Sequence, residues 1–257
     1  MKFPFRLSLD LLRGKVSRAF ANGRDGAMIR HLSPSLFTSD QKEVEAEANP
    51  EAAVMEIPAT VVAATTAPVL WVGGEEPLQH PVIGRIAAAL NQAGRNVFLH
   101  TNGARLRQRI HEFRPDPRLF LTVELAAREE LHDESVNQPG TFRRVIEGIR
   151  AAKLSGFHVC THVSINSRTD VCETGELFEF LDRYDVDGYI VSSGGRGSGN
   201  QLGGELREKL DEIRALVRCS RWEEFSELLE SSYLAAREKK VAVQVTGGDS
   251  NACEERA

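Results

Sequence analysis

The sequence predicts an α/β protein in which parallel strands form a partial barrel, with one helix before the barrel and further helices after it. Short apolar runs alternate with amphipathic stretches of helical length, and this alternation is typical of strands joined by crossover helices. No apolar run reaches the ~20 residues that a membrane helix needs. A composition of 41% hydrophobic and 27% charged residues excludes a collagen, a coiled coil and extensive disorder. The net charge of −5 gives no sign of a nucleic-acid partner.

Six apolar runs are expected to form the strands. They are residues 28–32, 68–73, 96–101, 119–125, 157–165 and 188–192. Pro81 and Gly94 bound an expected helix, and further helices are expected at about 141–155 and 173–184. Residues 241–245 could add a seventh strand. Because ligands bind at the carboxyl ends of parallel strands, we expect the functional residues at those ends.

Residues 1–25 are expected to form a basic amphipathic helix. Residues 1–24 carry six Lys or Arg against a single acid, Asp10. An apolar face recurs at helical spacing, formed by Leu9, Leu12, Val16 and Phe20. The helix either packs on the domain or lies on an anionic membrane surface. We expect a cytoplasmic protein, with peripheral contact at the inner membrane face as the alternative.

The four cysteines are scattered. Cys160, Cys172, Cys219 and Cys253 show neither a disulfide framework nor the close pairing of a zinc site, so free thiols are expected. Cys160 lies inside an expected strand and is interpreted as a small buried hydrophobe.

The C-terminal part, residues 201–246, is expected to hold two amphipathic helices, at 205–217 and 221–237, and the additional strand. The helices either cap the barrel or bind a protein partner. Residues 247–257 are expected to be a disordered tail.

Motifs at the expected strand ends resemble a known family. Residues 73–78 read GGEEPL and are followed by His80 and Pro81, and residues 101–103 read TNG. In this order and spacing they resemble the radical S-adenosylmethionine (SAM) superfamily. Residues 128–136 with 140–142, 151–157 and 185–188 resemble the branch that makes adenosylhopane in hopanoid biosynthesis.

The resemblance implies a partial (β/α)6 TIM-like barrel over residues 26–200. It also implies a SAM site at the strand ends and a [4Fe-4S] cluster on a C-x3-C-x2-C loop after the first strand. The candidate SAM or nucleoside contacts are Gly73, Gly74, Glu75, Glu76, Pro77, Thr101, Asn102, Thr122, Glu124, His162, Ser164 and Ser192. Glu75 stands where the family has a second glycine and would crowd the SAM carboxylate.

The cluster motif is missing. Residues 38–57, where the loop would lie, contain no cysteine, and the three family positions fall near Ser39, Glu43 and Ala46. A hydroxyl, a carboxylate and a methyl group cannot replace three thiolates on iron. The cluster is therefore predicted to be absent. The chain is predicted to be a pseudoenzyme, a regulatory homologue with an active paralogue as its partner.

Two alternatives remain open. His100, Glu124 and His162 follow consecutive strands, and two imidazoles with a carboxylate can bind a catalytic divalent metal with an open position. The chain would then be a metal-dependent barrel enzyme. In the other alternative it is an active radical SAM enzyme of hopanoid or isoprenoid lipid metabolism whose cluster ligands are not recognised.

Overall fold

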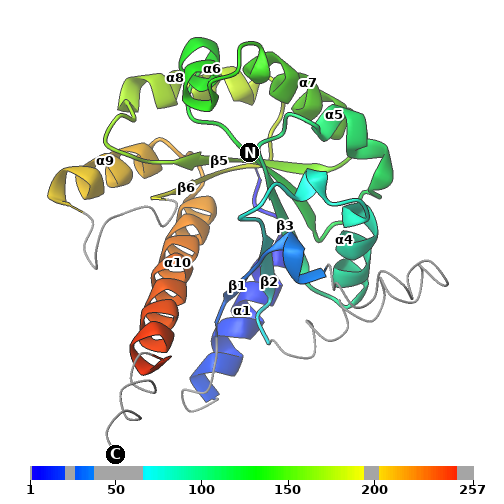
Figure 1. Cartoon of the computed structure of the whole chain (residues 1–257), viewed down its shortest axis with the longest axis vertical. Helices are drawn as coiled ribbons and strands as arrows, with labels where there is room; N and C mark the ends of the chain where they lie inside the picture. Colours follow the sequence, from blue (N-terminus) through cyan, green and yellow to red (C-terminus); the bar gives the residue numbers. More distant parts are fainter. Residues whose placement is uncertain (1, 21–26, 38–65, 194–202, 248–257) are drawn as a thin grey trace, which may run out of the picture.

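The computed structural model describes residues 2–20, 27–37, 66–193 and 203–247. Within them, six strands form one sheet in sequence order, and every neighbouring pair is parallel. The sheet curls into a half-barrel, and helices arch around its outer side (Figure 1). This confirms the predicted partial α/β barrel. The expected cluster loop over 38–57, Cys253 and residues 248–257 of the expected tail lie outside the described residues.

The observed elements follow the predicted ones closely. The strands are β1 (Ile29–Leu32), β2 (Val69–Val72), β3 (Asn96–Thr101), β4 (Leu119–Glu124), β5 (His158–Ser164) and β6 (Gly188–Ser192). The α-helices are α1 (Phe5–Phe20), α4 (Ile83–Gln92), α5 (Leu106–Arg109), α6 (Glu129–Val136), α7 (Thr141–Leu154), α8 (Val171–Asp182), α9 (Gly204–Ala215) and α10 (Ser220–Gly247). Short 3-10 turns are η1 (Pro34–Phe37), η2 (Pro77–Gln79) and η3 (Ile110–Glu112).

Strand register sets the layers inside the barrel. Trp71 pairs with Phe98, which pairs with Phe120, so these rings lie on the same face of the sheet. Phe98 and Phe120 stack with centroids 4.4 Å apart, and Phe225 of α10 stacks on Phe98 at 4.6 Å. This aromatic layer fills the barrel below its mouth. Side chains two residues further along each strand therefore lie at the carboxyl ends.

Helix α10 lies against the inner side of the half-barrel and contacts both edge strands, β1 and β6 (Figure 1). Ser226 and Glu230, one turn apart, accept the backbone N–H groups of Val191 and Ser193 at 3.0 and 2.7 Å. These bonds satisfy the edge of β6, which would otherwise present unpaired donors. Gly188 on β6 allows the helix this close, because a Cβ there would lie 2.2 Å from the Trp222 ring.

Residues 241–245 do not form a seventh strand. They belong to α10, so that prediction is wrong. A β-branched residue such as valine destabilises a helix by only roughly 0.5 kcal/mol relative to alanine. A helix that has already nucleated gains one backbone hydrogen bond for each residue it adds. The run VAVQV therefore continues the helix that precedes it.

Helix α1 packs on the barrel through a different face from the expected one. Leu7 and Leu11 are buried, whereas Leu12 is 57% and Val16 48% exposed. Phe5, 73% exposed, lies on the same stripe as Leu12 and Val16. The helix thus has two apolar faces, and only one of them contacts the core. None of the described helices is long and apolar enough to span a membrane.

Candidate functional site

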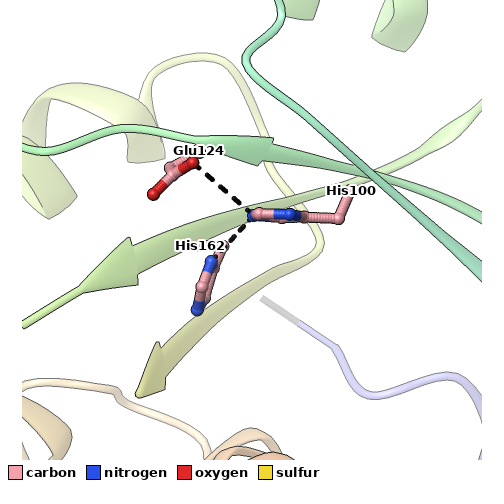
Figure 2. A group of neighbouring side chains, drawn as sticks. All are labelled: His100, Glu124 and His162. Carbon is pink, nitrogen blue, oxygen red and sulfur yellow. Dashed lines mark hydrogen bonds and ion pairs between the residues drawn. The ribbon is translucent and has the colours of Figure 1, made fainter. Parts of the chain in front are cut away.

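Three side chains converge at the mouth of the barrel. His100 is the second-to-last residue of β3, Glu124 ends β4 and His162 lies near the end of β5. His162 Nδ1 lies 2.9 Å from His100 Nε2, and the same His100 nitrogen lies 4.0 Å from Glu124 Oε2. Figure 2 shows the carboxylate and the second ring approaching one end of the His100 ring. We call these residues the histidine–carboxylate cluster.

Burial keeps both rings of the cluster neutral. His162 is 1% exposed, and burial, followed by the neighbouring His100, holds its pKa well below 6.5. Burial lowers the pKa of His100 to about 4, although Glu76 acts in the opposite direction. Each ring at neutral pH therefore has one N–H and one lone pair. The 2.9 Å contact joins the N–H of one ring to the lone pair of the other.

The surroundings fix the orientation of both rings. His162 Nε2 lies 2.8 Å from Ser192 Oγ on β6, which leaves Nδ1 toward His100. Trp71 packs against His100 with ring centroids 5.1 Å apart. Gly73 makes room for that ring, because a Cβ at Gly73 would lie 3.1 Å from the His100 Cβ. The first glycine of the GGEEP motif therefore leaves space for the His100 side chain at the mouth of the barrel.

Glu76 joins the two motifs that carry the family resemblance. Its Oε1 accepts the Thr101 hydroxyl at 2.6 Å, and its Oε2 accepts the Asn102 N–H at 2.8 Å. Oε1 also accepts the Leu78 N–H at 2.9 Å, at the start of η2. One carboxylate therefore ties the loop after β2 to the turn after β3.

The remaining predicted contacts fall in different environments. Gly74, with φ of +99°, and Glu75 are exposed beside the mouth, whereas Pro77 is buried. Thr122 is fully buried, and its hydroxyl finds no hydrogen-bond partner among the described residues. Ser164 ends β5 and is half-buried. The structure thus brings together the histidine–carboxylate cluster with Ser192, and separately Glu76 with Thr101 and Asn102.

The segments that resemble the hopanoid branch are joined to one another by side-chain contacts. Asp133 accepts the N–H groups of Gly140 and Phe142 at 2.5 and 2.8 Å, which joins residues 128–136 to residues 140–142 at the start of α7. Lys153 lies 2.7 Å from Asp187, which joins residues 151–157 to residues 185–188. Asp187 immediately precedes β6, at the end of the barrel opposite the mouth. The Lys153–Asp187 contact stabilises the barrel, as residues at this end commonly do.

Sequence reasoning missed the contacts between β1 and α10. His31 of β1 pairs in register with Trp71, and its Nε2 lies 2.7 Å from Ser232 Oγ on α10. The His31 and Tyr233 rings lie 4.5 Å apart, and burial, with a smaller effect of His100, lowers the pKa of His31 to about 4. The apolar run that predicted β1 placed His31 in a strand. No local signal, however, shows that α10 returns to contact it.

None of the described cysteines belongs to β1 or to η1, which follows it. Cys160 is fully buried within β5, as predicted, and burial raises the pKa of its thiol well above 9.0. Cys172 is exposed on α8, and Cys219 precedes α10. Residues 1–159 contain no cysteine. The chain therefore does not fit an iron–sulfur cluster held by a C-x3-C-x2-C loop after β1.

Fold and site together define a partial barrel with polar side chains gathered at the carboxyl ends of its strands. A family model described as the radical SAM superfamily matches residues 37–181. The match spans more than half of the chain, and the chain belongs to the radical SAM superfamily.

A curated relative and several solved structures are similar to this chain. AdoMet-dependent heme synthase from Methanosarcina barkeri is 31% identical over 141 residues, which cover 53% of this chain and 40% of the relative. The chain thus spans less than half of the length of that relative.

Among solved structures, Streptococcus suis SuiB bound to its precursor peptide SuiA is 13% identical with a TM-score of 0.53, covering 84% of this chain and 52% of that chain. SuiB bound to S-adenosylmethionine is 12% identical with a TM-score of 0.52, covering 79% and 50%. Archaeal TYW1 is 14% identical with a TM-score of 0.50, covering 77% and 75%. At these identities the likeness shows the fold alone.

Proposed function

We propose that this protein is a degenerate member of the radical SAM superfamily that does not generate the radical and acts as a regulatory, SAM- or nucleoside-binding homologue. The absence of cysteine from residues 1–159 carries the proposal. Radical generation in the family depends on an iron–sulfur cluster at the barrel mouth, and cluster irons need thiolate ligands.

The three cysteines present in the described residues are poor substitutes. The Cys160 thiol is buried and its pKa is raised, which disfavours the thiolate that iron binds. Cys172 lies on α8 and Cys219 on the segment before α10, so neither is close to Cys160 in sequence as in a C-x3-C-x2-C motif. The three aligned positions, Ser39, Glu43 and Ala46, offer no sulfur.

The mouth retains features that suit a nucleoside. The Glu76 contacts hold the exposed backbone of Gly74 and Glu75 in place beside the mouth. Glu124 and Ser164 end neighbouring strands on the same rim and can bind ribose hydroxyls. One structural neighbour, SuiB, was solved bound to S-adenosylmethionine. Without the iron chelate we expect binding weaker than in an active enzyme, because the strongest anchor is missing.

The cluster is tested by anaerobic purification and reconstitution with iron and sulfide. We expect substoichiometric iron and no charge-transfer absorption of an iron–sulfur cluster. The triple variant Ser39→Cys, Glu43→Cys, Ala46→Cys is the positive control, and it is expected to approach about four irons per chain. Stoichiometric iron and sulfide in the unchanged protein would overturn the proposal and favour an active enzyme of lipid metabolism with unrecognised ligands.

Retained ligand binding is tested by calorimetry with SAM, S-adenosylhomocysteine and adenosine. Heat with all three indicates recognition of the nucleoside, and heat with SAM alone indicates recognition of the sulfonium or amino-acid part. No heat and no thermal shift with any of them would remove the binding part of the proposal.

We further propose that α1 contacts an anionic lipid surface. The exposed stripe of Phe5, Leu12 and Val16 lies on a helix that carries Arg6, Arg13 and Lys15. Apolar side chains flanked by basic ones suit the boundary between lipid headgroups and acyl chains. This surface would place the protein at the inner face of a membrane, in keeping with the hopanoid-like resemblance.

The proposed protein partner, an active paralogue, has a smaller surface available than the sequence suggested. Trp222, Phe225 and Leu229 of α10 are fully buried against the sheet. Leu216, just after α9, and Leu234 of α10 remain exposed. A partner that binds through the C-terminal helices would therefore contact these residues.

A further inference from the structure

We propose that His100, Glu124 and His162 form a binding site for one divalent transition-metal ion of the Zn²⁺ type at the mouth of the barrel. Its ligands are none of the positions Ser39, Glu43 and Ala46, where the family's cluster ligands fall, and it uses no thiolate.

The geometry of the cluster is close to that of a ligand set. One ligand atom of each residue lies within 4.8 Å of the other two. Zinc bonds to imidazole and carboxylate of about 2.0–2.2 Å in a tetrahedral arrangement place two ligand atoms about 3.3 Å apart. The observed distances of 2.9 Å between His162 and His100 and 4.0 Å between His100 and Glu124 lie on either side of this value. To reach this separation the His162–His100 pair would open by about 0.4 Å, the His100–Glu124 pair would close by about 0.7 Å, and the Glu124–His162 pair, within 4.8 Å, would close by up to about 1.5 Å.

The backbone holds these three residues together without help from a loop. They come from β3, β4 and β5, which are neighbours in the sheet, and Glu124 pairs in register with His162. Sites built on strands keep their geometry better than sites built on loops. Figure 2 shows the Glu124 carboxylate and the His162 ring both approaching the same end of the His100 ring.

A second layer of contacts orients the rings as a metal requires. A histidine ligand usually has its other ring nitrogen in a hydrogen bond that fixes the tautomer. Here His162 Nε2 contacts Ser192 Oγ at 2.8 Å, so that Nδ1 faces the cluster. Trp71 packs against both His100, at 5.1 Å between centroids, and His162, at 5.6 Å.

Access and ligand type define the class of ion. The Glu124 side chain is 37% exposed and the His100 side chain 16%, so the cluster is open to solvent on the Glu124 side. Three protein ligands leave a coordination position for water or an anionic group. Two nitrogens and one oxygen favour Zn²⁺, Co²⁺ or Ni²⁺ over Mg²⁺ and Ca²⁺, which prefer oxygen ligands.

Metal binding is measured with the full chain after treatment with a chelator. Zn²⁺ is titrated by calorimetry against a competing chelator, and Co²⁺ is titrated by absorption. We expect one ion per chain and cobalt d–d bands without a thiolate-to-cobalt charge-transfer band. Such a band would indicate binding through cysteine and would overturn the assignment, as would the absence of stoichiometric binding.

Variants assign the ligands. His162→Ala and Glu124→Gln are each expected to weaken Zn²⁺ binding by more than tenfold, and Ser192→Ala by about tenfold through its contact with His162. The exposed His111 is the matched control, and His111→Ala should bind as the unchanged protein does. If His162→Ala does not fold, the partly exposed Glu124 decides the outcome. Equal affinity in Glu124→Gln and the unchanged protein, with folding shown by circular dichroism, would reject the site.

Discussion

The Glu76 carboxylate accepts the hydroxyl of Thr101 at 2.6 Å, so the loop after β2 and the turn after β3 are one hydrogen-bonded unit. The two motifs that identify the superfamily are thus in direct contact. Two further pairs of resembling segments are joined in the same way, by Asp133 to the start of α7 and by Asp187 to Lys153. In each pair a carboxylate links segments that are separate in sequence. Much of the resemblance therefore reflects contacts that stabilise the barrel.

The Glu76 contacts should contribute measurably to stability. Thr101 is buried, and Glu76→Ala leaves its hydroxyl and the Asn102 N–H without their acceptor. We expect the free energy of unfolding to fall by about 1–3 kcal/mol, as measured in urea. Glu75→Ala is the control, because that exposed neighbour should change it by less than about 0.5 kcal/mol. Equal stability of the two variants would show that these hydrogen bonds contribute nothing net.

The contact between β6 and α10 should depend on glycine at position 188. In Gly188→Ala the new methyl group meets the Trp222 ring at 2.2 Å, in a fully buried environment. We expect a loss of about 1–3 kcal/mol in the free energy of unfolding and a lower melting temperature. Gly203→Ala is the control, since its Cβ would meet no described residue within 4 Å. If Trp222→Leu relieves part of the loss in a double-mutant cycle, the clash is its cause.

Stability in acid should depend on Asp187. Burial would raise the pKa of this carboxyl, but hydrogen bonds from His158, Lys153 and the Val159 N–H outweigh burial and lower it below 3.8. A depressed pKa stabilises the fold above the unfolded value of about 3.9, and this contribution is lost as the pH falls through the folded pKa. Unfolding in urea from pH 6 to pH 2 should therefore show a steeper loss for the unchanged protein than for Asp187→Asn.

The control for this titration is the exposed Asp185, two residues earlier. Asp185→Asn should keep the acid-dependent loss of stability. Parallel pH curves for the unchanged protein and Asp187→Asn would contradict the assignment of that loss to Asp187.

Binding of α1 to lipid should require both apolar side chains and anionic headgroups. We expect the protein to sediment with vesicles that contain phosphatidylserine, to sediment less at high salt, and not to sediment with purely zwitterionic vesicles. Leu12→Ser with Val16→Ser should weaken the binding, because both residues are exposed on the stripe. Leu131→Ser removes an exposed leucine elsewhere and should leave binding unchanged. Vesicle binding that does not change with lipid charge, with salt or with the α1 substitutions would contradict the proposal that α1 binds an anionic lipid surface.

Local patterns were sufficient for the order, length and parallel arrangement of the strands. Apolar runs such as VLWV in β2 identify buried strands, and helices between them require crossovers of one hand. The predicted strands also give the positions of their carboxyl ends, so the residues at the mouth of the barrel could be predicted from their place in the sequence. The absence of cysteine from residues 1–159 is likewise read from the sequence alone.

Packing between distant segments decided the rest. Only the assembled barrel shows that Leu7 and Leu11, and not Leu12 and Val16, face the core, because both stripes of α1 are apolar. Only strand register brings His100 and His162 within 2.9 Å across 62 residues of chain. The role of α10, which satisfies the edge of β6 and reaches His31, depends on contacts between residues far apart in sequence. The spacing of apolar residues along the chain indicates which residues are buried, whereas the residues that they contact depend on the tertiary fold.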